Sequence, residues 1–203
     1  MALTILFATR NAHKISEVKE ILAPLGLDVR SLDAFPDLPE PPEDGDTFVA
    51  NALQKARFVA AQTGMVAVAD DSGLAVDALG GRPGVHSKRF TPEARADTNN
   101  ARLLRELAGV DDRGARFCCA IALVGPSGEG TAEGTCEGRI LRSPGGEGGF
   151  GYDPLFEAVA LPGRSLAQVS AAEKNAVSHR GEAFRQLPGL LRAQGLLPDK
   201  PAS

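Results

Sequence analysis

The chain has 203 residues, 43% of them hydrophobic and 24% charged, which suits one globular α/β domain with a substantial buried core. Its net charge of −4 and pI of about 5.4 argue against general binding to nucleic acid, so no DNA or RNA polymer is expected as a partner. Three cysteines without a CxxC pair are typical of buried thiols in a reducing compartment. No segment reads as a signal peptide or a membrane span, so we expect a cytoplasmic protein with no membrane partner.

Apolar periodicity and turn residues predict alternating strands and helices in the first half of the chain. The expected elements are a strand at 3–8, a turn at 9–14, a helix at about 13–22, a short strand at 28–31, a loop at 33–46, a helix from the N-cap Thr47 to about Gly64, a strand at 66–70 and a turn at 71–73. A strand followed by a helix is the repeating unit of α/β folds.

The second half is expected to contain a hairpin and to end in one long helix. The expected elements are a helix at 92–107, paired strands at 116–124 and 131–142, a flexible glycine-rich loop at 144–149, and a helix that a Ser170–Glu173 capping box begins and that stops near Leu187, before Pro188-Gly189. No linker divides the chain, so residues 1–197 are expected as one domain and residues 198–203 as a disordered tail.

Two adjacent acids, Asp70 and Asp71, follow the apolar run at 66–69. Open α/β sheets bind ligands at the carboxyl ends of their strands, and a buried carboxylate needs a positive partner. Neighbouring side chains of a strand point to opposite faces, so we expect one acid to face a cleft and the other to brace the loop. Carboxylate oxygens favour Mg²⁺ or Mn²⁺, and an ionised carboxylate can activate an attacking water. The alternative is an ordinary Asp-Ser-Gly turn.

The turn at 9–14 precedes a predicted helix, and a helix N-terminus offers free N–H groups that suit phosphate. Thr9 and Lys14 would add a hydroxyl and a charge, whereas the alternative is a plain turn with Asn11 as N-cap. Thr47, Asn51 and Lys55 form a polar stripe at helical spacing that is able to hold phosphate oxygens. Glu43 lies just ahead of that helix and is a candidate metal ligand, although a solvated face explains the stripe equally well.

The segment 146–151 matches the pattern GxGxxG, but it leads into a turn at Tyr152-Asp153-Pro154 where a dinucleotide motif requires a helix. We therefore interpret it as a loop that presents Phe150 for stacking on a base and Asp153 for a base N–H or for holding the loop. Core packing is the alternative, and it is favoured for Tyr152. Further along, Arg180 offers planar donors suited to a purine carbonyl.

These segments together resemble the inosine triphosphate pyrophosphatase family, also called Ham1-like. The likeness covers residues 3 to about 187, and five motifs carry it: Thr9-Arg10-Asn11 with Lys14, the run from Glu43 to Ala56, Ala69 to Leu74, Gly149 to Pro154, and Ser178-His179-Arg180. Arg10 and His13 depart from it, since many members have glycine at both positions.

The resemblance implies a long, mixed, twisted central sheet flanked by helices, with two lobes around a substrate cleft, in a homodimer. It implies Mg²⁺-dependent hydrolysis of ITP, dITP and XTP to the monophosphate and pyrophosphate, which removes damaged purines from the nucleotide pool. Asp71 would be the general base and, with Glu43, a metal ligand. The remaining residues would contact substrate: Thr9, Arg10, Asn11, Ala12, His13, Lys14, Asn51, Lys55, Ser72, Phe150, Gly151, Tyr152, Asp153, Lys174, His179 and Arg180.

Two other functions stay open at this point. A related enzyme of the nucleotide pool would act on pyrimidine or methylated nucleotides, and a sensor would bind nucleotides without turnover. The presence of Glu43, Asp71 and the lysines argues against the sensor, because a sensor needs no acid that activates water.

Overall fold

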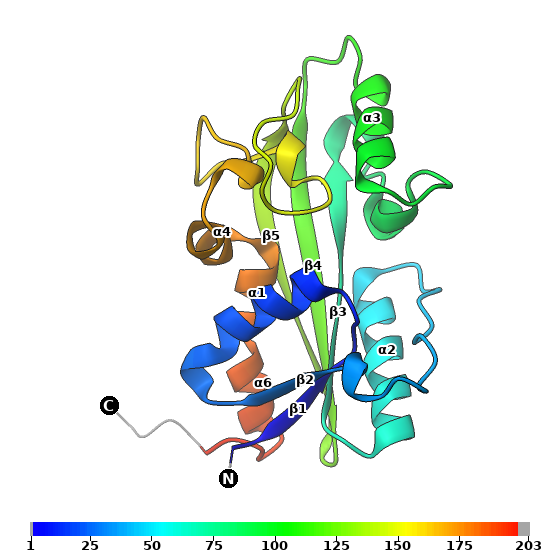
Figure 1. The fold of residues 1–203 in the computed structure, drawn as a ribbon, viewed down its shortest axis with the longest axis vertical. Coiled ribbons are helices and arrows are strands. Elements are labelled where there is room, and N and C mark those ends of the chain that lie inside the picture. Colours follow the sequence, from blue (N-terminus) through cyan, green and yellow to red (C-terminus); the bar gives the residue numbers. More distant parts are fainter. Residues whose placement is uncertain (1, 199–203) are drawn as a thin grey trace. The chain divides into compact units, whose positions relative to one another are not determined.

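The computed structural model describes residues 2–198 (Figure 1). The helices and strands are β1 (Thr4–Phe7), α1 (Ala12–Leu22), β2 (Asp28–Ser31), α2 (Phe48–Thr63), β3 (Ala67–Val76), α3 (Ala96–Glu106), β4 (Gly114–Gly125), β5 (Gly128–Ile140), β6 (Phe156–Ala158), α4 (Ala171–Val177), α5 (His179–Arg185) and α6 (Leu187–Ala193). Short 3₁₀ helices connect several of them. Most of the tail predicted at 198–203 lies outside the described residues.

One mixed sheet contains all six strands in the order β2-β1-β3-β4-β5-β6. The first three are parallel: Thr4 to Phe7 of β1 pair with Asp28 to Ser31 of β2, and Leu6 and Phe7 also pair with Ala67 and Val68 of β3. At the other edge β6 is antiparallel to β5, with Gly138 opposite Ala158. The mixed sheet and its flanking helices confirm the predicted fold class.

Side-chain oxygens cap the N-termini of α1 and α2, two helices that carry site residues. Asn11 Oδ1 accepts hydrogen bonds from the amides of His13 at 3.0 Å and Lys14 at 3.3 Å, so Asn11 is the N-cap of α1. Thr47 Oγ1 accepts one from the amide of Ala50 at 3.1 Å and caps α2 as predicted. These caps satisfy amides that the first helical turns leave without intrahelical partners.

The described chain separates into two compact units. The first contains the residues up to 71, residues 120–133 and those from 181 onward, and the second contains residues 72–119 and 134–180. Each unit has its own apolar cluster, and each is described by itself below.

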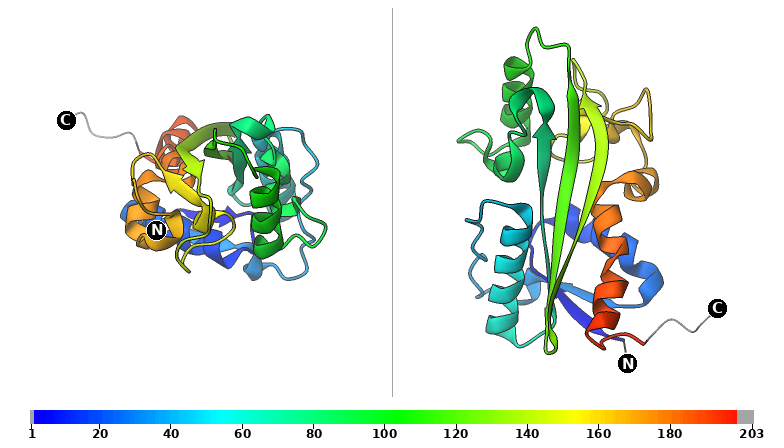
Figure 2. Two further views of the ribbon diagram at one scale, coloured as in Figure 1. Left: turned by 90° about the horizontal axis from the view of Figure 1, so that it is seen from above. Right: turned by 180° about the vertical axis from the view of Figure 1, so that it is seen from behind.

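In the first unit, helices lie on both sides of the sheet (Figure 2). Successive residues of a strand point to opposite faces, so they pack against different helices. Leu6 and Ala8 belong to a cluster with the small residues of α2, namely Ala52, Ala56 and Val59. Phe7 lies on the opposite face, where its ring meets that of Phe184 of α5 edge-on at 5.5 Å. The polar stripe of α2 is thereby held next to β3.

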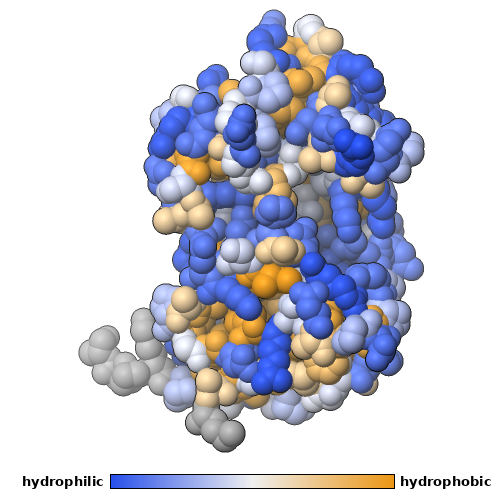
Figure 3. Space-filling model, viewed as in Figure 1, coloured by the Kyte–Doolittle hydropathy of each residue, from blue (hydrophilic) through white to orange (hydrophobic). Residues whose placement is uncertain are grey.

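In the second unit, α3 packs against the end of β3 and the strands beside it. Leu103 and Leu107 share an apolar cluster with Leu74 and Val76 of β3 and with Phe156 of β6. Hydrophilic side chains cover most of the face drawn in Figure 3, and apolar ones show in patches between them. Within residues 2–198, Val159 is the one large apolar side chain that is well exposed, and no helix combines the length and apolarity needed to cross a bilayer.

The predicted turn at 71–73 is wrong, because β3 continues through Asp71, Ser72 and Gly73 to Val76. Leu74 and Val76 are fully buried, and β3 lies between β1 and β4 in the sheet. Burial and sheet pairing therefore outweigh the turn preference of an Asp-Ser-Gly sequence. The two acids consequently lie within a strand rather than at its end.

The prediction of a single C-terminal helix is also wrong. After α4 the chain is extended at Ser178 (φ −74°, ψ 152°), and a new helix, α5, begins at His179. Lys174 and Ser178 thus do not share one helix face. Pro188 does not end the helix but lies in the first turn of α6, where proline costs no hydrogen bond. Similarly, α3 begins at Ala96 rather than at 92, because Ala94 is left-handed (φ 51°) and Arg95 is extended.

Candidate active site

The two neighbouring acids of β3 point to different partners, as the alternation of a strand requires. Lys14 Nζ of α1 lies 3.0 Å from Asp70 Oδ1 and also 3.0 Å from Asp70 Oδ2. Asp71 faces α2, where Asn51 Nδ2 donates a hydrogen bond of 2.9 Å to its Oδ2. Both carboxylates are buried, with side-chain exposures of 1% for Asp70 and 9% for Asp71. Asp70 therefore anchors Lys14, and Asp71 is the acid of the α2 stripe.

Burial raises the pKa of Asp71, although the nearby Lys55 charge and the Asn51 hydrogen bond oppose this rise. Lys55 Nζ lies 3.7 Å from Asp71 Oδ1 and forms a close ion pair with Glu43. Burial disfavours the charge of Lys55, but the carboxylates of Asp70, Asp71 and Glu43 outweigh it and raise the pKa of this lysine. Lys55 is therefore a charged ammonium between two acids, and Asp71 is a stronger base than an exposed aspartate.

A side-chain hydrogen bond within the turn at 9–13 stabilises its backbone. Thr9 Oγ1 accepts a hydrogen bond from the amide of Asn11 at 3.1 Å, and Ala12 and His13 lie exposed in the first turn of α1. Arg10 extends away to the loop at 35–40, where Nη2 donates to the carbonyls of Phe35 at 3.1 Å and Leu38 at 2.7 Å. Its Nη1 pairs with Glu40 at 2.7 Å. The Arg10 guanidinium, which departs from the family pattern, thus ties this loop to the turn that follows β1.

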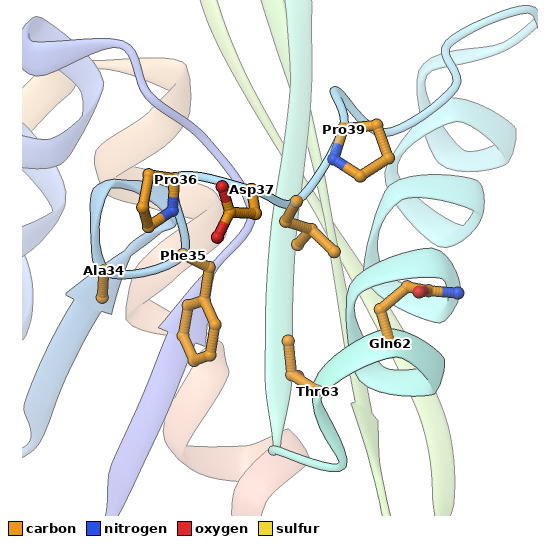
Figure 4. A pocket seen from close by; sticks show the side chains of 8 residues that line it. Ala34, Phe35, Pro36, Asp37, Pro39, Gln62 and Thr63 are labelled. Carbon is orange, nitrogen blue, oxygen red and sulfur yellow. The ribbon is translucent and has the colours of Figure 1, made fainter.

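The same loop forms one side of a hollow of about 380 Å³. Figure 4 shows its lining side chains, which come from the end of the 3₁₀ helix Leu32–Ala34, from the loop after it and from the last turn of α2. None of the residues predicted as site residues is among the described residues that line this hollow. Its walls mix apolar side chains with Asp37, Gln62 and Thr63, so a hollow alone does not identify the chemistry of this chain.

In the second unit, four of the predicted residues form a cluster around the ring of Phe150. Asp153 Oδ2 accepts hydrogen bonds from the Phe150 amide at 2.7 Å and from Lys174 Nζ at 2.6 Å. Lys174 Nζ lies 4.5 Å from the centre of the Phe150 ring, and the Arg180 guanidinium carbon lies 5.7 Å from it. Arg180 Nη2 also donates to Ser72 Oγ at 2.8 Å. Asp153 therefore holds the loop, which was one of its two predicted roles.

The glycine-rich loop needs glycine at its end. Gly149 has a positive φ of 67°, and a Cβ there would collide with the Asp153 carboxylate. The chain then enters a 3₁₀ turn at Asp153–Leu155, which agrees with the rejection of a dinucleotide motif. Tyr152 packs in the apolar cluster of this unit, and its hydroxyl donates to the carbonyl of Ser87 at 2.9 Å.

Two supporting residues gave no signal in the sequence. Phe117 of β4 stacks on the ring of His179 with the ring centres 4.8 Å apart and the planes at 13°. Asn100 of α3 donates to the carbonyl of Gly151 at 3.1 Å. Both belong to elements that are distant in sequence from the residues they contact, so neither periodicity nor a motif could identify them.

Ten of the predicted site residues thus form two clusters, one in each unit, whereas Thr9 to His13, Gly151 and Tyr152 belong to neither. The cluster of the first unit contains Lys14, Glu43, Asn51, Lys55, Asp70 and Asp71. The cluster of the second unit contains Ser72, Phe150, Asp153, Lys174 and Arg180. His179 precedes Arg180 in the sequence and stacks on the ring of Phe117. The first has the carboxylates and lysines of phosphate chemistry, and the second has an aromatic ring among cations.

Glu43 and Asp71 provide the hard oxygen donors that Mg²⁺ prefers, and the raised pKa of Asp71 shows a buried carboxylate that further positive charge would stabilise. In the part of the chain that the structure describes, no group of three His, Cys, Asp or Glu side chains is placed to hold a metal by itself. The residues therefore fit an ion held by one or two carboxylates and completed by phosphate oxygens, which is how Mg²⁺ commonly binds.

Comparison with known proteins is informative over nearly the whole chain. The family model described as the Ham1 family matches residues 5–189. The chain belongs to the Ham1 family. Among curated Ham1 relatives, the "dITP/XTP pyrophosphatase" of Nitratidesulfovibrio vulgaris is 54% identical over 194 residues, which are 91% of this chain and 93% of the relative. The protein of that name from Desulforamulus reducens is 50% identical over 191 residues, or 92% and 94% of the two chains.

Solved structures of Ham1 proteins resemble this one closely. The Ham1 protein from Coxiella burnetii is 40% identical, with a TM-score of 0.81 over 94% of this chain and 99% of that one. The Ham1 protein from Staphylococcus aureus is 35% identical, with a TM-score of 0.82 over the same shares of the two chains. The mixed sheet with its flanking helices is therefore the Ham1 architecture.

Proposed function

We propose that this Ham1 protein hydrolyses damaged purine nucleoside triphosphates, namely ITP, dITP and XTP, to the monophosphate and pyrophosphate. Curated relatives that are about half identical over nine-tenths of the chain are named dITP/XTP pyrophosphatases, which supports this substrate class. The observation that carries the proposal is the buried Asp71 carboxylate, which Asn51 and Lys55 hold beside Glu43. Removal of such triphosphates before a polymerase uses them is the cellular role that follows.

Asp71 acts as the general base in this proposal. Burial raises its pKa, so its carboxylate binds a proton more readily than an exposed aspartate does. The attacking water transfers a proton to Asp71 as its oxygen bonds to the α-phosphorus, and the bond to the bridging oxygen breaks to release pyrophosphate. Lys14 pairs with Asp70 and Lys55 with Glu43. When the substrate binds, these two lysines supply the positive charge that faces its phosphates.

The cluster around Phe150 accounts for base recognition. The Phe150 ring stacks on the purine, and Arg180 and Lys174 beside it donate hydrogen bonds to a 6-oxo group. A 6-amino purine presents a donor at the same place and would leave these donors unpaired, which is the stronger form of discrimination.

Mg²⁺ is the proposed cofactor, with Mn²⁺ as a substitute, and Glu43 and Asp71 would hold it. When bound, the ion supplies charge neutralisation of the phosphate oxygens and of the leaving pyrophosphate. We also propose that the protein is a cytoplasmic homodimer that binds no nucleic acid polymer. The acidic pI supports the last point, and sedimentation of the purified chain tests the dimer.

A substrate panel tests the proposed function. The purified chain is incubated with Mg²⁺ and ITP, dITP, XTP, GTP, ATP or a pyrimidine triphosphate, and pyrophosphate and orthophosphate are measured separately. We expect pyrophosphate from the first three substrates and little from ATP. Orthophosphate as the product, a preference for pyrimidines, or tight binding without turnover would each contradict the proposal, and the last would favour the nucleotide sensor.

A further inference from the structure

Asn51 in α2 is buried, with 2% of its surface exposed, and both ends of its carboxamide are bonded to protein groups. Its Oδ1 accepts a hydrogen bond of 2.7 Å from the amide of Gly45, and its Nδ2 donates one of 2.9 Å to Asp71 Oδ2. The polar stripe of α2 suggested that Asn51 binds phosphate. In the structure its acceptor is directed at the acidic loop at 43–46 and its donor at the proposed base.

The chemistry of the two partners fixes the orientation of this carboxamide. The Gly45 amide only donates, so it must meet the oxygen of the carboxamide. The NH₂ group then faces Asp71, where it stabilises an ionised carboxylate. Asn51 therefore links the loop and the base through one accepted and one donated hydrogen bond, and a residue with only acceptors or only donors cannot replace it.

Gly45 lets the acidic loop come this close to α2. A Cβ at position 45 would lie 2.9 Å from Ala50 Cβ and 2.9 Å from Asn51 Oδ1, so any larger residue would push the carboxamide aside. Glu43 lies two residues earlier on the same loop, and it pairs with Lys55, one helical turn after Asn51. The acidic loop and β3 thus both form bonds with the same stretch of α2, from Asn51 to Lys55.

We propose that Asn51 is a positioning residue, whose carboxamide fixes the Asp71 carboxylate and holds the loop of Glu43 in register with it. This inference depends on the proposed role of Asp71 in hydrolysis. Because both ends of the carboxamide are bonded to protein groups, Asn51 acts in this proposal through Asp71 and the loop, and its loss lowers kcat while KM stays nearly unchanged. A phosphate ligand would behave differently, because its loss raises KM.

Two substitutions separate the two bonds of Asn51. Asn51→Ala removes both, whereas Asn51→Asp keeps an acceptor for the Gly45 amide and loses the donor to Asp71. We expect kcat for ITP to fall by roughly 10- to 100-fold in each variant, as for other lost hydrogen bonds to charged groups, with KM within about threefold of wild type. Asn51→Asp is expected to be no better than Asn51→Ala, because it places a second carboxylate beside Asp71.

Gln54→Ala is the matched control. Gln54 lies one turn further along α2 and bonds the same loop, with Nε2 donating to Asp44 Oδ1 at 2.5 Å and Oε1 accepting from the Asp44 amide at 3.3 Å. Neither bond involves Asp71 or Gly45, so Gln54→Ala removes contacts to the same loop and leaves both bonds of Asn51 in place. We expect its kcat to stay within about twofold of wild type, since exposed hydrogen bonds contribute little.

Hydrogen exchange at the Gly45 amide gives a second readout that needs neither substrate nor metal. We expect slow exchange in wild type, Gln54→Ala and Asn51→Asp, and at least about tenfold faster exchange in Asn51→Ala. If Asn51→Asp does not fold, Gly45→Ala takes its place, because its Cβ displaces the carboxamide and should also lower kcat. Wild-type kcat in Asn51→Ala, wild-type kcat in a folded Asn51→Asp, or an effect on KM alone would overturn the inference.

Failure of the proposed function has a different signature. An inactive wild-type protein with a protected Gly45 amide would refute the hydrolysis of ITP and leave the contact in place. An active wild type together with an equally active Asn51→Ala would refute the positioning role alone.

Discussion

Replacing Lys174 by methionine removes the cationic half of a buried ion pair. Lys174 Nζ lies 2.6 Å from Asp153 Oδ2, and the two side chains are 7% and 4% exposed. The substitution keeps most of the volume of the lysine stem, so the main effect is a buried carboxylate without its ammonium partner. The same carboxylate holds the amide of Phe150 at 2.7 Å, so the loop of Phe150 is expected to loosen as well.

Breaking one partner of a buried pair costs about 3–5 kcal/mol, because the remaining charge is left desolvated. For a chain of this length, that loss corresponds to a decrease in Tm of roughly 6–20 °C. Asp153→Asn with Lys174→Met should be less destabilising than the sum of the two single changes, because the double variant buries no unpaired charge.

The assay is urea unfolding followed by circular dichroism, and Arg164→Met is the matched control. Arg164 pairs with Glu173, the neighbour of Lys174 on α4, at 2.9 Å, but the side chains are 44% and 42% exposed. An exposed pair contributes about 0–1 kcal/mol, so this variant should unfold close to wild type. A loss below about 1 kcal/mol in Lys174→Met, equal to that of the control, would refute the reasoning that burial makes this pair essential.

Three further predictions concern single side chains. Asp71→Asn should lower kcat by about 10²- to 10⁴-fold without lowering Tm, because burial raises the pKa of Asp71 and the ionised form therefore costs folding free energy; near-normal ITP hydrolysis would exclude its role as base. Arg180→Lys keeps the charge but loses the planar donors, so the ratio of kcat/KM for ITP over ATP should narrow, and an unchanged ratio would count against recognition by Arg180. Hydrogen bonds from Ser170 and Arg164 lower the pKa of Glu173 from 4.5 to about 2, so the ionised carboxylate stabilises the folded state above pH 4.5 and less as the pH falls toward 2. The Tm difference between wild type and Glu173→Gln should shrink over that interval, and a constant difference would contradict this.

Local sequence signals predicted the parts of the fold that depend on neighbouring residues. Thr47 and the Ser170–Glu173 pair begin helices as their side-chain chemistry indicates. The short strand Asp28–Ser31 and the hairpin of β4 and β5 were also predicted, since alternation and turn residues mark them. These features need no information about distant parts of the chain.

Features that depend on distant partners were not predictable in this way. The sequence Asp-Ser-Gly favours a turn, but sheet pairing and the burial of Leu74 and Val76 keep β3 extended. The break at Ser178 has no glycine or proline to announce it. Tertiary contacts override local preference in β3, and at Ser178, which is fully buried, no local signal marks the break.

The candidate site shows the same division. The motifs identified Glu43, Lys55 and Asp71, because their residue types and spacing suit phosphate chemistry. They did not predict that Arg10 bonds the loop at 35–40, since its partners are 25 or more residues away. They placed Asn51 on a stripe able to hold phosphate, but a helical stripe does not show that its carboxamide is bonded to Gly45 and Asp71.

The position of attack is the most direct test of the account. ITP is hydrolysed by the purified protein in water labelled with ¹⁸O, and the two products are analysed by mass spectrometry. Attack on the α-phosphorus with Asp71 as base predicts that the label enters the nucleoside monophosphate and that the pyrophosphate is unlabelled. Label in the pyrophosphate alone would place the attack on another phosphorus and contradict the central claim.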